Sequence, residues 1–348
     1  MSITSQEQIT RPGRQPRSVL WRGDRTVASD LPVDRIADEL ADDPDTRAWW
    51  CLPRDAAALA ETAEMLGLDR FAVDDVIGPR ESPKLDAVGA TVIVVSAATA
   101  FDPPAAELGV QRVSILATDR VLVVVADDGP LAQLIPTLMD CAGRMRVDGI
   151  AAGVHIVLES LVDGYATALE AMEEAIDTLT ASLFDDRPMG RAEQLRAFRM
   201  RQAIGRLRKV ATPMTQVTAE LASAAARSTD EQVDDPAAVL LGTNTSRRFA
   251  DVADHARHAE AGTIGLREML TSAFETNLAL SDVHLNMIMK KLSAWAAIIA
   301  VPTLITGFFG MNVPYPGFGQ GGGFLVGLAV MVTAVVTLFV LFRRSDWL

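Results

Sequence analysis

Two long apolar segments close the chain. Residues 292–309 and 324–342 contain no charged side chain. Each is close to the roughly 20 residues that an α-helix needs to cross about 30 Å of hydrocarbon. A core helix of a soluble protein would normally keep a polar face along part of its length. We therefore expect two transmembrane helices, at residues 292–312 and 323–342, with a short loop between them.

Residues 150–291, ahead of these spans, have a helical pattern with few Gly or Pro interruptions. The apolar spacing predicts helices over 151–183 and 191–225, and a third from about residue 247 that runs into the first span. The polar stretch 228–245 is a connection with room for a short helix. A helical pattern this long without caps is typical of a stalk that leads into a membrane.

Residues 19–149 mix strand and helix patterns. β-branched runs at 91–95, 113–116 and 121–125 predict strands. Thr118-Asp119, between the last two runs, is typical of a hairpin turn. These features predict a cytoplasmic α/β domain with a mixed, partly antiparallel sheet. The fold class is thus an α+β membrane protein with this domain, a long helical stalk and two C-terminal spans.

Amphipathic helices are expected in the same region at 55–66 and 131–145. Residues 1–18 are polar and contain Pro and Arg, without the apolar core of a secretory signal. We expect this segment to be a disordered tail.

Charges at the ends of the spans predict their orientation. Lys290 and Lys291 precede the first span, Arg343 and Arg344 follow the second, and the loop 310–323 has no charge. By the positive-inside rule, both termini face the cytoplasm and the chain is a multi-pass protein of the cell (inner) membrane. The four cations would also anchor the protein to lipid headgroups.

The overall charge excludes one class of partner. The chain carries 45 acidic and 32 basic residues, a net charge of −13. An acidic chain is a poor nucleic-acid binder, because phosphate contacts need Lys and Arg. The charge is compatible with cation binding, although simple solubility is the more common reason for an acidic chain.

Motifs for enzymatic chemistry are missing from the sequence. The two cysteines form no CxxC pair, and there is no HExxH, P-loop, GxSxG or GxGxxG after a strand. His255 and His258 have ligand-like spacing on a predicted helix, although solvated histidines are the more common case. We do not expect an enzyme.

Gly310-Met311-Asn312 stands at the outer end of the first of two C-terminal spans. In this position it resembles the signature of the CorA family of divalent-cation channels. The terminal residues 343–348 are similar to the basic, Trp-Leu-ending cluster of that family, and segments 68–76 and 82–85 are similar to one in its N-terminal domain. Asn286, Met289, Lys290 and Leu292 are similar to the start of its pore helix.

The resemblance implies a homopentamer that carries Mg²⁺ through a central pore into the cell, with Co²⁺ and Ni²⁺ as further candidate ions. An amide oxygen is a neutral hard ligand, and a ring of them can accept hydrated Mg²⁺ without stripping its water. An Asn at a helix end is otherwise a common cap. The implied roles are a selectivity entrance at Gly310, Met311 and Asn312, a pore lining at Asn286, Thr303 and Gly307, and a hydrophobic gate at Met289 and Leu292.

The resemblance also places Asp251 at a regulatory site for cytosolic Mg²⁺. Its partner would be a carboxylate of the adjacent subunit, for which we select Asp102. Bridging Mg²⁺ would hold the subunits together and favour the closed pore. Solvated helix acids are the simpler alternative.

Some residues depart from the family pattern. Phe309 replaces the Tyr common before the signature, Ala300 stands where a pore Met is frequent, and Pro302 lies one residue nearer the signature. The loop 313–319 lacks acidic residues. Two alternatives therefore stay open: a ZntB-like zinc transporter, and a membrane-anchored sensor or scaffold without ion flux.

Overall fold

The computed structural model describes residues 17–78, 82–181, 190–227, 235–241, 245–311, 319 and 321–348. The chain divides into two compact units. The first contains residues 1–185 and 190–270, and the second contains residues 186–189 and 271–348. The predicted tail falls outside the described residues up to residue 16, and the first strand begins at Ser18.

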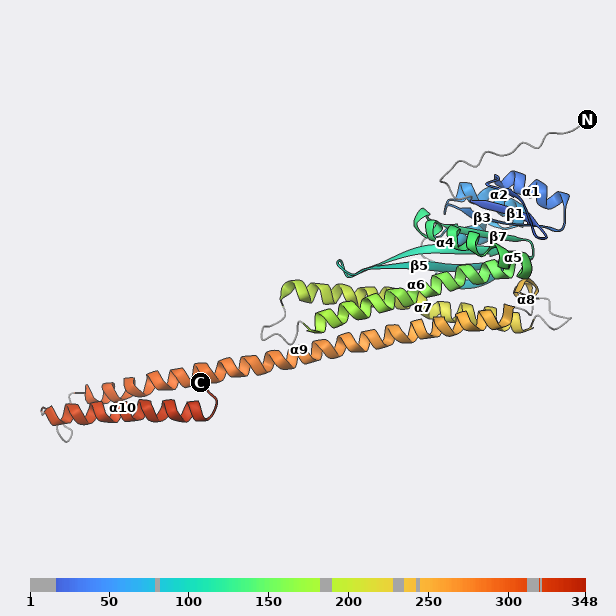
Figure 1. Ribbon diagram of the computed structural model, residues 1–348. Coiled ribbons are helices and arrows are strands. Elements are labelled where there is room, and N and C mark those ends of the chain that lie inside the picture. Colours follow the sequence, from blue (N-terminus) through green and yellow to red (C-terminus); the bar gives the residue numbers. More distant parts are fainter. Residues whose placement is uncertain are drawn as a thin grey trace, which may run out of the picture. The chain divides into compact units, whose positions relative to one another are not determined.

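A mixed sheet forms the centre of the first unit (Figure 1). Among the described residues it has seven strands in the order β2-β1-β3-β7-β6-β5-β4, and only β3 and β7 pair in parallel. The strands are β1 Ser18–Arg22, β2 Arg25–Ser29, β3 Thr46–Leu52, β4 Lys84–Val88, β5 Thr91–Asp102, β6 Glu107–Ala117 and β7 Val121–Ala126. The predicted mixed sheet is confirmed.

The predicted hairpin joins β6 to β7. The two strands pair antiparallel. The Thr118 amide donates to the Val121 carbonyl at 2.9 Å, and the Thr118 hydroxyl accepts from the Val121 amide at 3.1 Å. A Thr side chain that bonds its own turn in this way stabilises the reversal.

Helices cover both faces of the sheet (Figure 1). Buried residues of α1, α2 and α3, such as Ile36, Leu59 and Val76, form one core with alternate strand residues. On β7, Val123 belongs to this core, whereas its neighbour Leu122 lies under Gly153 of α6 on the other face. Coverage of both faces explains why every residue of β7 is buried. The helices are α1 Val33–Asp42, α2 Ala56–Leu66, α3 Arg70–Ile77, α4 Asp128–Asp140, α5 Ala142–Asp148, α6 Ile150–Ala181, α7 Arg191–Arg227 and α8 Pro236–Leu241.

One predicted helix is wrong in detail. The segment 131–145 is two helices, because the chain turns at Cys141. The Cys141 amide closes α4 on the Thr137 carbonyl at 3.1 Å, and its own carbonyl accepts from the Arg144 amide at 2.9 Å. The turn brings Met145 of α5 into the core beneath Gly153.

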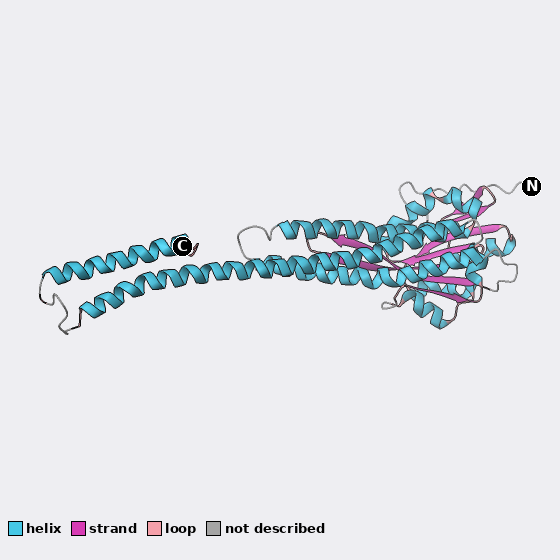
Figure 2. Cartoon of the chain, turned by 90° about the horizontal axis from the view of Figure 1, so that it is seen from below, coloured by secondary structure: helices cyan, strands magenta, loops and turns pink. Residues whose placement is uncertain are grey.

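Helix α9, Ser246–Phe309, is a single helix of 64 residues, as the uninterrupted pattern predicted (Figure 2). Its first part belongs to the first unit, where Phe249 and Val252 are buried. A Cβ on Gly262 would lie 2.9 Å from Leu169 Cδ1 of α6. This glycine therefore allows close approach of α6 and α9.

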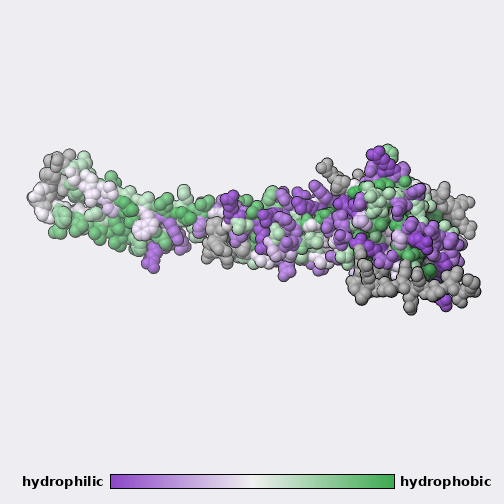
Figure 3. Space-filling view, turned by 90° about the horizontal axis from the view of Figure 1, so that it is seen from above, coloured by the Kyte–Doolittle hydropathy of each residue, from purple (hydrophilic) through white to green (hydrophobic). Residues whose placement is uncertain are grey.

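The second unit consists mainly of the end of α9 and helix α10, Gly321–Arg344. Both are long and apolar enough to cross a membrane. Few of their residues are buried, and apolar side chains cover their surface (Figure 3). Such a surface suits lipid or further apolar helices and is unfavourable in water.

Candidate ion pathway

The end of α9 has two different sides. Ala294 and Ile298 are buried, and Phe309 lies against Gly327 of α10. These three positions share one side of the helix, at about 100° per residue. Phe309 meets α10 on this side, and Ala294 and Ile298 are buried on the same side.

The opposite side of α9 holds most of the predicted pore residues. They lie about half a turn from the packed side, and all are exposed on the single chain. Asn286 is exposed too, but lies about a quarter turn from this line. The residues that share the face are Met289, Leu292, Thr303, Gly307 and Gly310.

Thr303 is held by its own helix. Its hydroxyl donates to the Ile299 carbonyl at 2.8 Å. A Thr in a membrane-spanning helix commonly donates its proton to its own backbone in this way. The oxygen keeps a lone pair, so an exposed Thr303 still offers an acceptor to a hydrated cation.

Backbone hydrogen bonds close the end of α9 and leave little space at Gly310. The Gly310 amide donates to the Thr306 carbonyl at 2.9 Å, and the Met311 amide donates to the Phe308 carbonyl at 3.2 Å. A Cβ on Gly310 would lie 3.0 Å from the Thr306 carbonyl oxygen, an atom of the rigid backbone. Only glycine fits here without displacement. Asn312, the third residue of the predicted entrance, lies outside the described residues.

Met289 and Leu292 form an apolar pair near the other end of the segment. Their exposed fractions are 62% and 65%. Lys290 and Lys291 lie between them in sequence and are also exposed. An exposed apolar pair next to two cations is unfavourable on an isolated helix in water, so a neighbour of some kind must cover it.

The predicted regulatory residues are separate on one chain. Asp251 lines an open hollow with Asp254, Arg247, Arg248 and Arg257. Asp254 is paired with Arg257 at 2.8 Å, whereas Asp251 is exposed and has no ion pair within the described part of the chain. Arg248 is paired with Asp148 at 2.7 Å. Asp251 is therefore the one carboxylate of this hollow without a described ion pair, and a single carboxylate is a poor site for Mg²⁺.

Asp102 has a local structural role. Its side chain accepts from the Ala105 amide at 3.3 Å, at the tip of the β5–β6 hairpin. Across the described residues, no group of three or more His, Cys, Asp or Glu side chains is arranged to hold a metal. The pairing of Asp251 with Asp102 stays a prediction.

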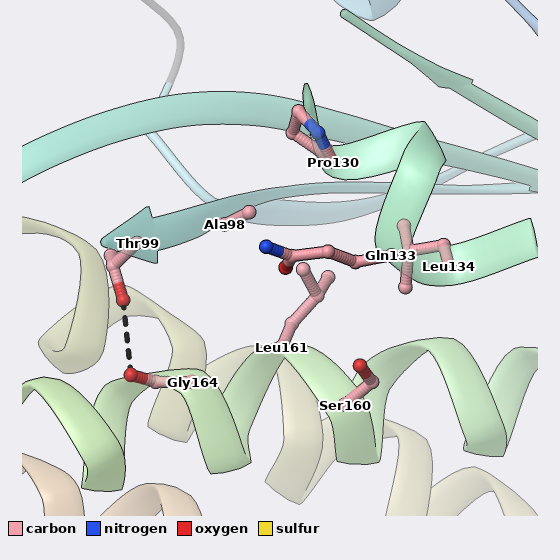
Figure 4. A pocket seen from close by; sticks show the side chains of 8 residues that line it. All are labelled: Ala98, Thr99, Pro130, Gln133, Leu134, Ser160, Leu161 and Gly164. Carbon is pink, nitrogen blue, oxygen red and sulfur yellow. Dashed lines mark hydrogen bonds between the residues drawn. The ribbon is translucent and has the colours of Figure 1, made fainter. Parts of the chain in front are cut away.

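One small cavity lies inside the first unit. A cavity between β5, α4 and α6 has a volume of about 20 Å³ (Figure 4). At one end of it, the Thr99 hydroxyl donates to the Gly164 carbonyl at 3.3 Å. This space is about right for one water molecule and too small for a metabolite.

Comparison with known proteins decides the family. The chain matches the family model described as CorA-like Mg²⁺ transporter protein over residues 51–344. The chain belongs to the CorA family. The cobalt/magnesium transport protein CorA of Thermotoga maritima is 25% identical over 291 residues, which are 82% of this chain and 78% of that protein.

Solved structures agree on the fold. The complete CorA magnesium transporter from Methanocaldococcus jannaschii aligns with a TM-score of 0.72 at 18% identity, over 95% of this chain and 98% of that one. The ZntB cytoplasmic domain from Vibrio parahaemolyticus is more distant, with a TM-score of 0.50 and 10% identity over 68% of this chain and 88% of that one. Members of the CorA family are transporters, which is consistent with the expectation that this chain is not an enzyme.

Sequence reasoning missed the contact of Gly327 with Phe309. Gly327 is buried in α10, four residues after the equally buried Gly323. The available signal was this spacing, because small residues four apart in an apolar segment often mark close helix packing.

Proposed function

We propose that this chain is a subunit of a channel that conducts Mg²⁺ into the cell. Five copies would surround a central pore, with both termini in the cytoplasm. The observation that carries the proposal is the division of α9 into a side that packs on α10 and an opposite exposed side with the predicted pore residues. Membership in a family of Mg²⁺ transporters supports the same function.

At the outer end, we assign ion selection to Asn312 and the carbonyl groups of the preceding Gly310 and Met311. Five amide oxygens at one level would contact the water shell of Mg²⁺ without removing it, since this ion gives up water reluctantly. Thr303 would offer a further oxygen along the way. Gly307 has open space around its α-carbon, which keeps this part of the pore wide.

Toward the cytoplasm, Met289 and Leu292 would form apolar rings. A narrow apolar ring excludes water, and a hydrated ion cannot pass until the ring widens. We assign the closed state to this dewetted ring. The basic residues at the inner ends of both spans support the orientation of the chain.

We further propose that cytosolic Mg²⁺ closes the channel by bridging Asp251 to Asp102 of the adjacent subunit. Asp251 is exposed and is a single carboxylate, so the further oxygen ligands that Mg²⁺ needs would come from a second chain. Mg²⁺ that binds the closed assembly better than the open one shifts the population toward closed.

Uptake into proteoliposomes that contain a Mg²⁺-sensitive dye tests the channel. We expect Asn312→Ala to abolish uptake while the detergent-purified oligomer elutes unchanged. Asn277→Ala, the same substitution elsewhere on α9, is the matched control and should keep wild-type uptake. Uptake of Mg²⁺ at the wild-type rate in Asn312→Ala would remove the entrance assignment.

The same assay separates the alternatives. Zn²⁺ uptake without Mg²⁺ uptake would assign the chain to zinc transport, for which the uncharged loop 313–319 is the motivation. No uptake of either ion would favour a sensor or scaffold. For the regulatory part, Asp251→Lys should weaken inhibition by Mg²⁺ inside the vesicle, and an unchanged inhibition curve would refute it.

A further inference from the structure

We infer that Gly327 of α10 is a positioning residue for the pore entrance, because the ring of Phe309 packs directly on it. We call this contact between Gly327 and Phe309 the seat. This inference rests on the proposed function, since it assigns a role in ion entry to a residue outside the pore face. Phe309 is the last residue of α9, and the entrance begins at the next residue.

The contact is defined by distances. Gly327 is buried, and a Cβ built on it would lie 3.4 Å from each of three Phe309 ring atoms, Cγ, Cδ1 and Cε1. Three equal distances mean that the face of the ring covers the α-carbon. Glycine within a helix costs roughly 1 kcal/mol relative to alanine, so a buried glycine at a helix contact is explained by close packing.

The entrance residues Gly310 and Met311 follow Phe309 directly in the chain, and backbone hydrogen bonds tie them to the last turn of α9. Phe308 packs edge-on against Phe309, with ring centroids 5.7 Å apart and an interplanar angle of 86°. The amides of Gly310 and Met311 bond back to carbonyls of the last turn. A displaced Phe309 ring therefore moves the backbone at the entrance with it.

The size of the substituent at residue 327 sets the displacement. A methyl group would meet the ring at 3.4 Å, close to ordinary contact, so Gly327→Ala requires only a small shift. The larger side chain of Gly327→Leu must push the ring away by an ångström or more. A displacement of about 1 Å in a binding ring can reduce its performance by one to two orders of magnitude.

Initial uptake rates in proteoliposomes, measured against external Mg²⁺ concentration, test the seat. We expect Gly327→Leu to raise the Mg²⁺ concentration for half-maximal uptake by about tenfold and Gly327→Ala by about twofold, with a smaller change in maximal rate. Gly322→Leu is the matched control, because its α-carbon on α10 faces open space. It should behave as the wild type.

A size exchange separates positioning from general damage. Phe309→Ala introduced into Gly327→Leu gives the leucine room, and we expect the half-maximal concentration to return toward the wild-type value. A merely structural role would lower the maximal rate or the oligomer yield without moving this concentration. Unchanged concentrations in both Gly327 variants would overturn the inference, and so would a failure of the double variant to recover while its oligomer remains intact.

A second readout does not need ion flux. In full-length protein with Cys141→Ser, the labelling rate of Met311→Cys by a membrane-impermeant thiol reagent reports the environment of the entrance. We expect Gly327→Leu to change this rate at least several-fold and Gly322→Leu to leave it unchanged. If wild-type vesicles carry no ion but the rate changes, the channel proposal fails and the seat stands; an unchanged rate refutes the seat.

Discussion

Gly153 lies where α6 is closest to β7 and α5, and its replacement by alanine should destabilise the first unit. A Cβ there would lie 2.5 Å from Leu122 Cδ2 and 2.8 Å from Met145 Sδ. Carbon atoms normally make contact at about 3.5–4.0 Å. Both neighbours are almost fully buried, at 0% and 1% exposure, so neither side chain can move toward solvent.

Two opposing terms set the magnitude for Gly153→Ala. Overpacking of a dense core costs about 1–3 kcal/mol, and the better helix propensity of alanine returns about 0.8–1 kcal/mol. We expect a net loss on the order of 1 kcal/mol. Gly153→Val should lose more, because its two additional methyl groups enter the same space and its β-branch gives less helix stabilisation.

Gly205→Ala is the matched control. Gly205 lies in the middle of α7, is exposed, and has nothing within 4 Å of the position of a Cβ. Only the propensity term applies, so this variant should gain about 0.5–1 kcal/mol. The same substitution in two helices of one unit thus has opposite signs.

Thermal unfolding of the purified full-length chain measures the difference. Trp21, Trp49 and Trp50 are buried in the sheet and report on the first unit by intrinsic fluorescence. At about 2–4 °C per kcal/mol for a unit of this size, Tm should fall by a few degrees for Gly153→Ala and rise by a few for Gly205→Ala. A rise of equal size in both variants would show that the core between α6 and β7 is not packed as described.

Two further predictions concern α6. Tyr165→Phe removes a fully buried hydroxyl that donates to the Ala97 carbonyl at 2.8 Å. The free energy of unfolding should fall by about 0.5–1.5 kcal/mol, which thermal unfolding detects as a lower Tm. An unchanged Tm would contradict this. Burial lowers the pKa of His155 below its ordinary 6.5, although Glu159 opposes the shift. Stability associated with His155 is therefore complete above pH 6.5 and declines as pH falls toward the lower folded value. The slope of Tm between pH 6.5 and 5 should be shallower in His155→Gln, and an equal slope would refute this.

The long helices could be predicted from the sequence because their pattern is local. An unbroken apolar period from residue 247 onward is sufficient for α9, and charge-free segments are sufficient for both spans. The first strands are harder. β3 is buried along most of its length and so shows no alternation, and β4 carries Lys84 and Asp86 on a strand of five residues. Their place in the sheet is set by pairing with distant segments, such as β3 with β7.

The proposed pore face could be chosen in part from the sequence. Gly310 stands in a recognisable motif, and the resemblance to the family places Thr303 and Gly307 among its pore-facing residues. The seat on Gly327 could not be found by periodicity. In a span whose residues are all apolar, the hydrophobic pattern does not indicate which side meets a neighbouring helix. The spacing of Gly323 and Gly327 indicates a packed side of α10, and the contact with Phe309 identifies what packs there.

If α9 lines the ion pathway, its two different sides imply that several copies of the chain assemble. One face of the helix is covered by α10, and the opposite face, with Thr303 and Gly307, is open on a single chain. One such face encloses nothing, so an ion could cross only where several copies bring these faces together. Small residues there permit close approach between helices, as packing in a membrane requires. A bulky substitution at Gly307 should therefore reduce uptake, while the Tm of the first unit stays unchanged, because Gly307 contributes nothing to that core.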